Sequence, residues 1–280
     1  MDIVNFFEAK FEKNETPKSD NDWEVGPLDE CSIESINKFG KAVIHNGKVY
    51  IAYCINPLLA FICSMATDNI IKSLNSYLKK NYIISTQSIF NVCNTYGNGY
   101  VQCKIPDAYI YAENDRNIPL VFKCAFANES LGQLIQECVT YINEFTRISY
   151  SIGFKVEYNN EHFKGYLFVF ERVLEPNEDK IKEMNILIEN KELQFKHKYP
   201  SVELHEFEKA FFNDEMRNFN VKVCFKKHFD DKNIQETVEF DLDKSKIDPE
   251  QMGSVKIQIE KEHLLNMFDL WKRKFHRREI

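Results

Sequence analysis

The sequence is poor in glycine and proline, with nine and eight residues respectively among 280. This scarcity excludes collagen-like, linker-rich and low-complexity chains, which depend on those two residues. Hydrophobic residues make up 44% of the chain and aromatic residues 14%. Such a composition is typical of a globular protein, and the length suits one large domain or two modest ones.

The chain also lacks a hydrophobic run of membrane-spanning length. Its longest apolar stretch begins at Leu58 and ends before Asp68, well short of the ~20 residues that a membrane-spanning helix needs. No basic segment followed by an apolar one opens the sequence, as a secretory leader would. We therefore expect an intracellular protein, cytoplasmic or nuclear, that is not secreted and has no membrane partner.

Cysteine and histidine patterns typical of metal sites are missing too. None of the eight cysteines forms a Cys-x-x-Cys pair, and the seven histidines are scattered. Most of the cysteines lie within apolar runs, which predicts buried thiols in a reducing compartment rather than a disulfide framework or a zinc site.

Positive charge is in the minority, because 36 Lys and Arg residues face 43 Asp and Glu residues for a net charge of -7. This balance argues against a protein that coats nucleic acid over its whole surface. One compact basic run nevertheless stands at the C-terminus and contains Lys272, Arg273, Lys274, Arg277 and Arg278. Two interpretations remain open: contact with DNA or a nuclear address, and a solvated helix end whose cations suit the helix dipole.

What the sequence does contain is a regular order of strand and helix patterns. Residues 1–40 are expected to be an N-terminal lead-in, in which the polar stretch 10–30 is loose. Asn46-Gly47 then separates two β-rich runs and predicts a hairpin. Apolar residues at spacings of three and four predict a helix over 57–80, with Ile62, Ala66, Ile70, Leu74, Tyr77 and Leu78 on its buried face.

Three strand runs follow this helix, over residues 82–92, 100–112 and 120–126. Pro106 has no backbone N–H, so we expect a bulge or a strand end there. The third run is almost continuously apolar, which favours a central strand that is buried on both faces.

Ser130 and Gln133 form a capping box at the start of a second helix, expected over residues 131–148. Strands over 151–157 and 163–173 come next. Beyond Pro176 lie further helix and strand patterns, which form either a small α+β domain or an extension of the first domain. We therefore expect an α/β fold with a mixed sheet flanked by helices over residues 41–174, and a C-terminal α+β extension over residues 175–280.

The α-β-β-β-α-β order and the local sequence resemble the restriction endonuclease family within the PD-(D/E)XK, or restriction-endonuclease-like, superfamily. The matching segments include the Asn46-Gly47 hairpin, the Pro106-Asp107 pair and the run 119–125 before the second helix. The resemblance covers about residues 41–173. It implies a Mg²⁺- or Mn²⁺-dependent nuclease site with Asp107 as a metal ligand and catalytic residue.

The sequence departs from that pattern at the second acidic position. In one alignment Lys123 occupies that position, and in the other Lys123 is the lysine of the motif while Val121 replaces the acid. An ammonium group has no lone pair, so Lys123 cannot bind a metal, although it could pair with Asp107 in the metal's place. The simpler interpretation of Lys123 is a lysine on an edge strand whose side chain reaches solvent. The simpler interpretation of Asp107 is a residue in a turn or bulge.

Other acids could replace the missing ligand. Glu113 and Glu129 are the nearest in sequence, and either is a candidate catalytic residue if the protein is active. Gln133, Gln136 and Glu137 lie on the polar side of the second helix, where they either line a site or face solvent.

We expect a degenerate nuclease-like protein that needs no cofactor and binds nucleic acid or another protein. Two alternatives are an active nuclease that uses Mg²⁺ or Mn²⁺ with a relocated acid, and an interaction protein that never had a site.

Overall fold

The structure is a computed structural model of the 280-residue chain. It describes residues 23–27, 41–45, 48–52, 57–85, 90–93, 95–96, 101–113, 118–125, 129–158, 163–190, 201–230 and 236–266. No helix within those ranges is long and apolar enough to cross a membrane.

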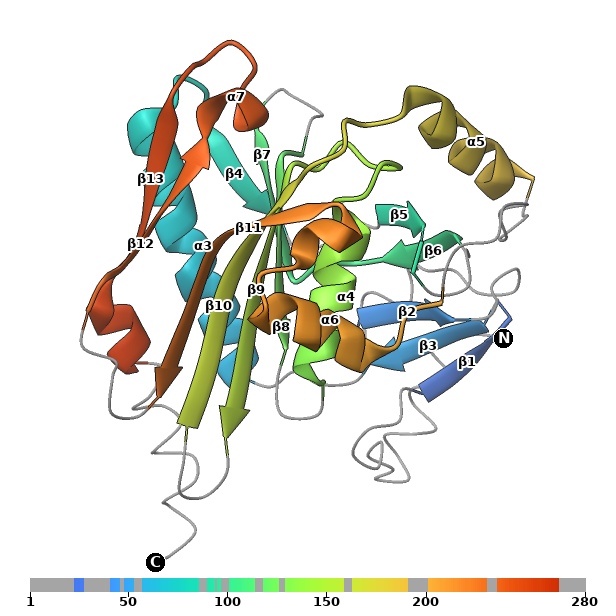
Figure 1. Cartoon of the computed structure of the whole chain (residues 1–280), viewed down its shortest axis with the longest axis horizontal. Coiled ribbons are helices and arrows are strands. Elements are labelled where there is room, and N and C mark those ends of the chain that lie inside the picture. The colour runs from blue at the N-terminus through green and yellow to red at the C-terminus, as the bar shows by residue number, and fades with distance from the viewer. Residues whose placement is uncertain are drawn as a thin grey trace, which may run out of the picture.

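A mixed six-stranded sheet forms the centre of the molecule (Figure 1), with the strand order β11-β10-β9-β8-β7-β4. The strands are β4 (Tyr82–Ser85), β7 (Ala108–Ala112), β8 (Leu120–Ala125), β9 (Tyr150–Tyr158), β10 (Phe163–Arg172) and β11 (Val221–Asp230). All neighbours are antiparallel except β8 and β9, which are parallel and joined by a helical crossover. The predicted α/β class with a mixed sheet is therefore confirmed.

Helices cover both faces of this sheet. Helix α3 (Pro57–Tyr77) packs on one face, where Ile70 and Leu74 join Leu120 and Phe122 in one core cluster. Helix α4 (Leu131–Tyr141) packs on the other face, where Leu134 joins a second cluster. All six residues of β8 are buried, as expected for a central strand between two layers. Tyr77, expected on the buried face of α3, is instead half-exposed.

Two of the predicted strands are each divided in two. The 82–92 run gives β4 and β5 (Phe90–Cys93), and the 100–112 run gives β6 (Val101–Lys104) and β7. β4 pairs with β7 in the central sheet, whereas β5 pairs with β6 in a separate two-stranded ribbon. Pro106 lies at the break between β6 and β7, as its missing N–H predicts.

The predicted N-terminal hairpin is confirmed as β2 (Lys41–His45) paired with β3 (Lys48–Ala52). The prediction of a loose polar stretch over residues 10–30 is wrong for Trp23–Pro27. These residues form β1, which pairs with β3 in a three-stranded sheet. The backbone hydrogen bonds of that ladder outweigh the polar character of the surrounding sequence.

Helix α4 begins at the predicted capping box, in which Ser130 accepts from the Gln133 backbone and Gln133 accepts from the Ser130 backbone. It ends at Tyr141 rather than near residue 148. Beyond this point the Asn143 side chain donates to the Cys93 carbonyl and accepts from the Phe145 N–H. Such local side-chain bonds compete with helix continuation.

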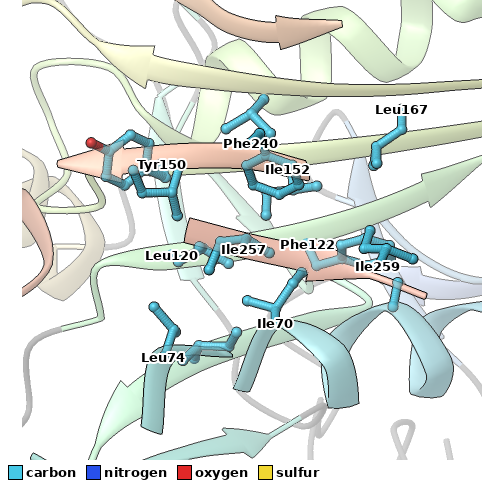
Figure 2. Packing of buried hydrophobic residues seen from close by; sticks show 14 of the residues in the cluster. Ile70, Leu74, Leu120, Phe122, Tyr150, Ile152, Leu167, Phe240, Ile257 and Ile259 are labelled. Carbon is cyan, nitrogen blue, oxygen red and sulfur yellow. The ribbon is translucent and has the colours of Figure 1, made fainter. Parts of the chain in front are cut away.

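The C-terminal segments are built onto the same core. α6 (Leu204–Phe212) and the 3₁₀ turn η2 (Met216–Phe219) pack with α4, and α5 (Glu178–Glu189) packs against the β5–β6 ribbon. β12 (Val238–Asp243), α7 (Lys244–Ile247) and β13 (Ser254–Ile259) form a hairpin element beside α3. Figure 2 shows Phe240, Ile257 and Ile259 of this hairpin among the side chains of α3 and the sheet.

Candidate functional site

Asp107 and Lys123 lie at two neighbouring strands, β7 and β8, as the sequence predicted. Asp107 directly precedes β7, and the first residue pair of β7 and β8 joins Ala108 to Phe122. Side chains alternate between the two faces of a strand. Because Phe122 faces α3 and Val121 faces α4, Lys123 points toward α4 as well.

The Lys123 ammonium lies between two carboxylates. Its Nζ is 3.0 Å from Glu137 Oε2 and 3.8 Å from Asp107 Oδ2. Glu137 lies in α4, seven residues after the Ser130 cap, so the helix brings this acid over β8. Only 6% of Lys123 is exposed. Lys123 is therefore not an edge-strand lysine that reaches solvent.

A second lysine completes the arrangement. Lys104 is the last residue of β6, and its Nζ donates to Glu137 Oε1 at a distance of 2.8 Å. Asp107, Lys123, Glu137 and Lys104 are called the charged cluster below. Because the two ammonium groups match the two carboxylates, these four side chains carry no net charge when all are ionised.

The electrostatics favour an ionised Lys123. Burial alone would lower the pKa of its ammonium, but Asp107 and Glu137 together raise that pKa well above its ordinary value. Glu129 also raises it, by less than those two residues. The pKa of the Tyr141 phenol beside them is raised, chiefly by burial. The chain thus holds a permanent cation at this position.

Asp107 also has a structural role. Its Oδ2 accepts a hydrogen bond of 2.7 Å from the backbone N–H of Cys124 in β8. The paired residues of β7 and β8 begin at Ala108 and Phe122, so the Asp107 carboxylate continues the ladder beyond them. The turn interpretation and the site interpretation of Asp107 are therefore compatible.

The remaining candidate residues are distributed differently. Glu113 follows the far end of β7, where its carboxylate accepts from Asn81 at 3.0 Å, so the structure does not bring it to the cluster. Glu129 lies just before the α4 cap, near enough to influence Lys123. Gln133 serves the capping box. The basic tail, Lys272, Arg273, Lys274, Arg277 and Arg278, lies outside the described residues.

In the charged cluster, the carboxylates that could bind a divalent metal ion are paired with the Lys123 ammonium. Asp107 and Glu137 offer suitable oxygen atoms, but Lys123 Nζ lies between them at 3.8 and 3.0 Å. Within the described part of the chain, no three His, Cys, Asp or Glu side chains gather as a metal-binding group. The arrangement is suited to fixing α4 on the sheet through buried ion pairs.

Sequence reasoning placed Glu137 only among residues that could line a site, and it missed Lys104. The spacing places Glu137 on the polar side of α4, one helical turn after Gln133, but it does not show that this side lies over Lys123. Lys104 gave no such signal, because its approach depends on the separate β5–β6 ribbon.

Comparisons of the chain with protein-family models, with curated proteins and with solved structures give no match.

Proposed function

We propose that this protein is a non-catalytic relative of the restriction-endonuclease-like superfamily that acts by binding nucleic acid or another protein. The observation that carries the proposal is the buried Lys123 ammonium between the carboxylates of Asp107 and Glu137. In a nuclease of this type a divalent cation would need those oxygen ligands. Here a side chain of the protein supplies the positive charge instead.

The order of elements supports the superfamily part of the proposal. Helix α3 is followed by β4, β7 and β8 as antiparallel neighbours, then by α4 and the parallel strand β9. This is the α-β-β-β-α-β order of the resemblance, with β5 and β6 as an insertion. Asp107 directly precedes the second of these strands and Lys123 lies in the third, which are the positions that the resemblance implies for the motif residues.

Charge repulsion supports the non-catalytic part. Two like unit charges 4 Å apart repel by about 4 kcal/mol at an effective dielectric constant of 20, and a divalent ion doubles this value. Lys104 adds a second ammonium on Glu137. We therefore expect no tight Mg²⁺ or Mn²⁺ binding and no appreciable nuclease activity from the wild type.

Calorimetry with Mn²⁺ tests this expectation. Wild type should give no heat of specific binding, whereas Lys123→Glu should create a Mn²⁺ site by placing a third carboxylate between Asp107 and Glu137. The matched control is Lys256→Glu, which changes an exposed lysine of β13. Circular dichroism establishes that each variant is folded. Mn²⁺-dependent cleavage of DNA by the wild type that is lost in Asp107→Ala would overturn the proposal.

One observation favours a second candidate, an active metal-dependent nuclease. Glu137 brings an acid from α4 into contact with Lys123, so Glu137 rather than Glu113 is the relocated acid that this candidate requires. In that case Glu137→Gln should abolish cleavage as completely as Asp107→Asn does, while Glu113→Gln should leave it unchanged. Equal activity of all three variants would attribute the cleavage to a contaminant.

The proposal that the protein binds nucleic acid can be tested separately through the basic tail. If the tail contacts DNA, replacing Lys272, Arg273, Lys274, Arg277 and Arg278 with alanine should weaken binding to all DNA sequences. It should also flatten the dependence of log K on log salt, since each phosphate contact releases counterions. An unchanged curve at low salt would exclude the tail as a DNA contact and direct attention to a protein partner.

A further inference from the structure

A cavity of about 380 Å³ lies at the end of the sheet where β10 finishes and α7 begins. In Figure 1 this is the upper end, where the chain leaves β10 toward α5. Three cationic side chains and one carboxylate are among its lining residues, which are Arg147, Ser149, Arg172, Glu175, Pro176, Ser245, Lys246 and Pro249. The cavity is distinct from the charged cluster, because Ser149 lies four residues before Gly153, the β9 partner of Lys123.

Arg172 is the central feature of this cavity. It is 9% exposed, and its Nη1 donates to the carbonyl oxygens of Thr146 at 2.8 Å and Ile148 at 3.0 Å. Among the described residues it forms no ion pair with a carboxylate, although Glu175 lies on the same wall. Burial lowers the pKa of its guanidinium, which means that the charge is incompletely compensated. The two carbonyls fix the planar group while its remaining N–H donors stay available.

Ser149 supplies a second buried polar group in the wall of the cavity. It is 7% exposed, and its backbone N–H and C=O bond to the Pro119 carbonyl and the Arg172 N–H. No hydrogen bond joins its hydroxyl to another residue within the described ranges. A hydroxyl in a cavity wall that has no such bond can donate to a ligand in the cavity.

Arg147 and Lys246 also line the cavity, Arg147 from the connection between α4 and β9 and Lys246 from α7. Arg147 holds Glu178 through Nε at 3.1 Å and Nη2 at 2.6 Å, and both side chains are more than half exposed. Lys246 of α7 pairs with Glu171 at 2.6 Å. The Arg147 pair is exposed, so it is weak enough for another anion to replace it.

We propose that this cavity binds the phosphate group of a small phosphorylated molecule. Arg172 and Ser149 form the preorganised part of the site, and Arg147 and Lys246 complete it from the rim. The planar guanidinium matches phosphate oxygens in a two-point contact. The volume exceeds what a phosphate ion needs and lies within the range of small-molecule sites, which leaves room for an organic body.

Calorimetry with inorganic phosphate and with phenyl phosphate, at constant ionic strength set by sodium chloride, tests the proposal on the full chain. Both probes should bind, and amide signals of Ser149, Arg172 and Ser245 should shift on titration. Arg147→Gln combined with Lys246→Gln should weaken binding about tenfold or more, because charge-assisted hydrogen bonds are lost. The control Lys256→Gln removes a lysine of β13 that is more exposed than Lys246 and lies outside the cavity wall, so it should leave affinity unchanged.

Glu178→Gln gives a second test, and because Glu178 is exposed, the substitution should not disturb the fold. It releases Arg147 from its carboxylate, so phosphate should bind severalfold more tightly. Binding that is unchanged in both the double variant and Glu178→Gln would overturn the proposal, as would heats no larger than those of chloride. If inorganic phosphate binds but phenyl phosphate does not, the proposal of a phosphorylated organic ligand is overturned and the cavity is a site for an inorganic anion only.

Discussion

Lys123 shows how a single residue decides the chemistry of the candidate site. A lysine in a central strand is costly to bury unless its charge is paired. Here Asp107 and Glu137 provide that pairing from two different elements. The two carboxylates in turn depend on Lys123, since its ammonium offsets their mutual repulsion together with that of Lys104.

Replacing Lys123 with methionine should therefore destabilise the fold. Lys123→Met keeps the length of the side chain but leaves two carboxylates without their shared partner, which should cost about 3 kcal/mol of unfolding free energy. Urea denaturation followed by far-UV circular dichroism measures the loss. Lys256→Met, which removes an exposed ion pair with Glu239, should change stability by less than about 1 kcal/mol. Equal effects of the two variants would contradict a buried ion-pair role for Lys123.

The ion pairs of Lys123 should also make stability depend on pH in the alkaline range. The folded-state pKa of Lys123 lies above the unfolded value of about 10.4, so its stabilisation is complete below that pH. This stabilisation is lost as pH rises from the unfolded-state pKa to the folded-state pKa of Lys123. Between these two pKa values the loss is about 1.4 kcal/mol per pH unit. The stability difference between wild type and Lys123→Met should thus be constant from pH 8 to 10 and shrink above pH 10.4. A difference that stays constant to pH 11 would refute this dependence.

At the scale of secondary-structure elements, α4 connects the sequence signal to the site. Its start is set by the Ser130–Gln133 capping box, and its buried stripe, which includes Leu134 and Cys138, fixes its rotation on the sheet. Once the start and the rotation of α4 are fixed, the Glu137 side chain lies on the part of the helix that faces Lys123. The position of the second carboxylate is thus a consequence of helix capping and packing.

Loss of the cap should weaken both the helix and the cluster. Ser130→Ala removes the bond from the Gln133 N–H and should cost about 1 kcal/mol of unfolding free energy. Ser76→Ala in α3 is the control, because the Ser76 hydroxyl donates only to the Lys72 carbonyl within the helix and should contribute nothing measurable. Urea titration compares the two variants, and a loss below about 0.3 kcal/mol in Ser130→Ala would contradict the role of the cap.

At the scale of the whole molecule, segments far apart in sequence build one core. The α3 side of the sheet is covered by α3 and by the β12–β13 hairpin, which contributes Phe240, Ile257 and Ile259 (Figure 2). β11 pairs with β10 along nearly its whole length and extends the central sheet. Stability of the sheet should consequently depend on residues near the end of the described chain.

Ile257→Ala tests this dependence. Ile257 is fully buried beside α3, so its truncation should cost about 2–5 kcal/mol. If the hairpin belongs to the same cooperative unit, amide hydrogens of β8, such as that of Phe122, should exchange faster by a corresponding factor. The control Ile186→Ala changes an isoleucine that is 55% exposed on α5 and should have little effect. Unchanged exchange in β8, despite a destabilised hairpin, would show that the C-terminal region unfolds separately.

The sequence by itself determined the features that depend on local chemistry. Asn46-Gly47 indicated the hairpin, Ser130 and Gln133 the start of α4, and Pro106 a strand end, because backbone freedom, capping and a missing N–H act within a few residues. The apolar run 120–126 likewise predicted the central strand β8. The closeness of the two strand runs in sequence and the apolar stripes of the two helices predicted that the strands at Asp107 and Lys123 are neighbours, as β7 and β8 are.

Only the tertiary structure decided which groups meet Lys123. Glu137 and Lys104 reach the cluster from α4 and from the β5–β6 ribbon, and their approach depends on packing rather than on sequence spacing. The same is true of the cavity around Arg172, whose walls come from three connections and α7. Long-range pairing and burial select these neighbours from many residues of equal local propensity, so no pattern along the chain could identify them.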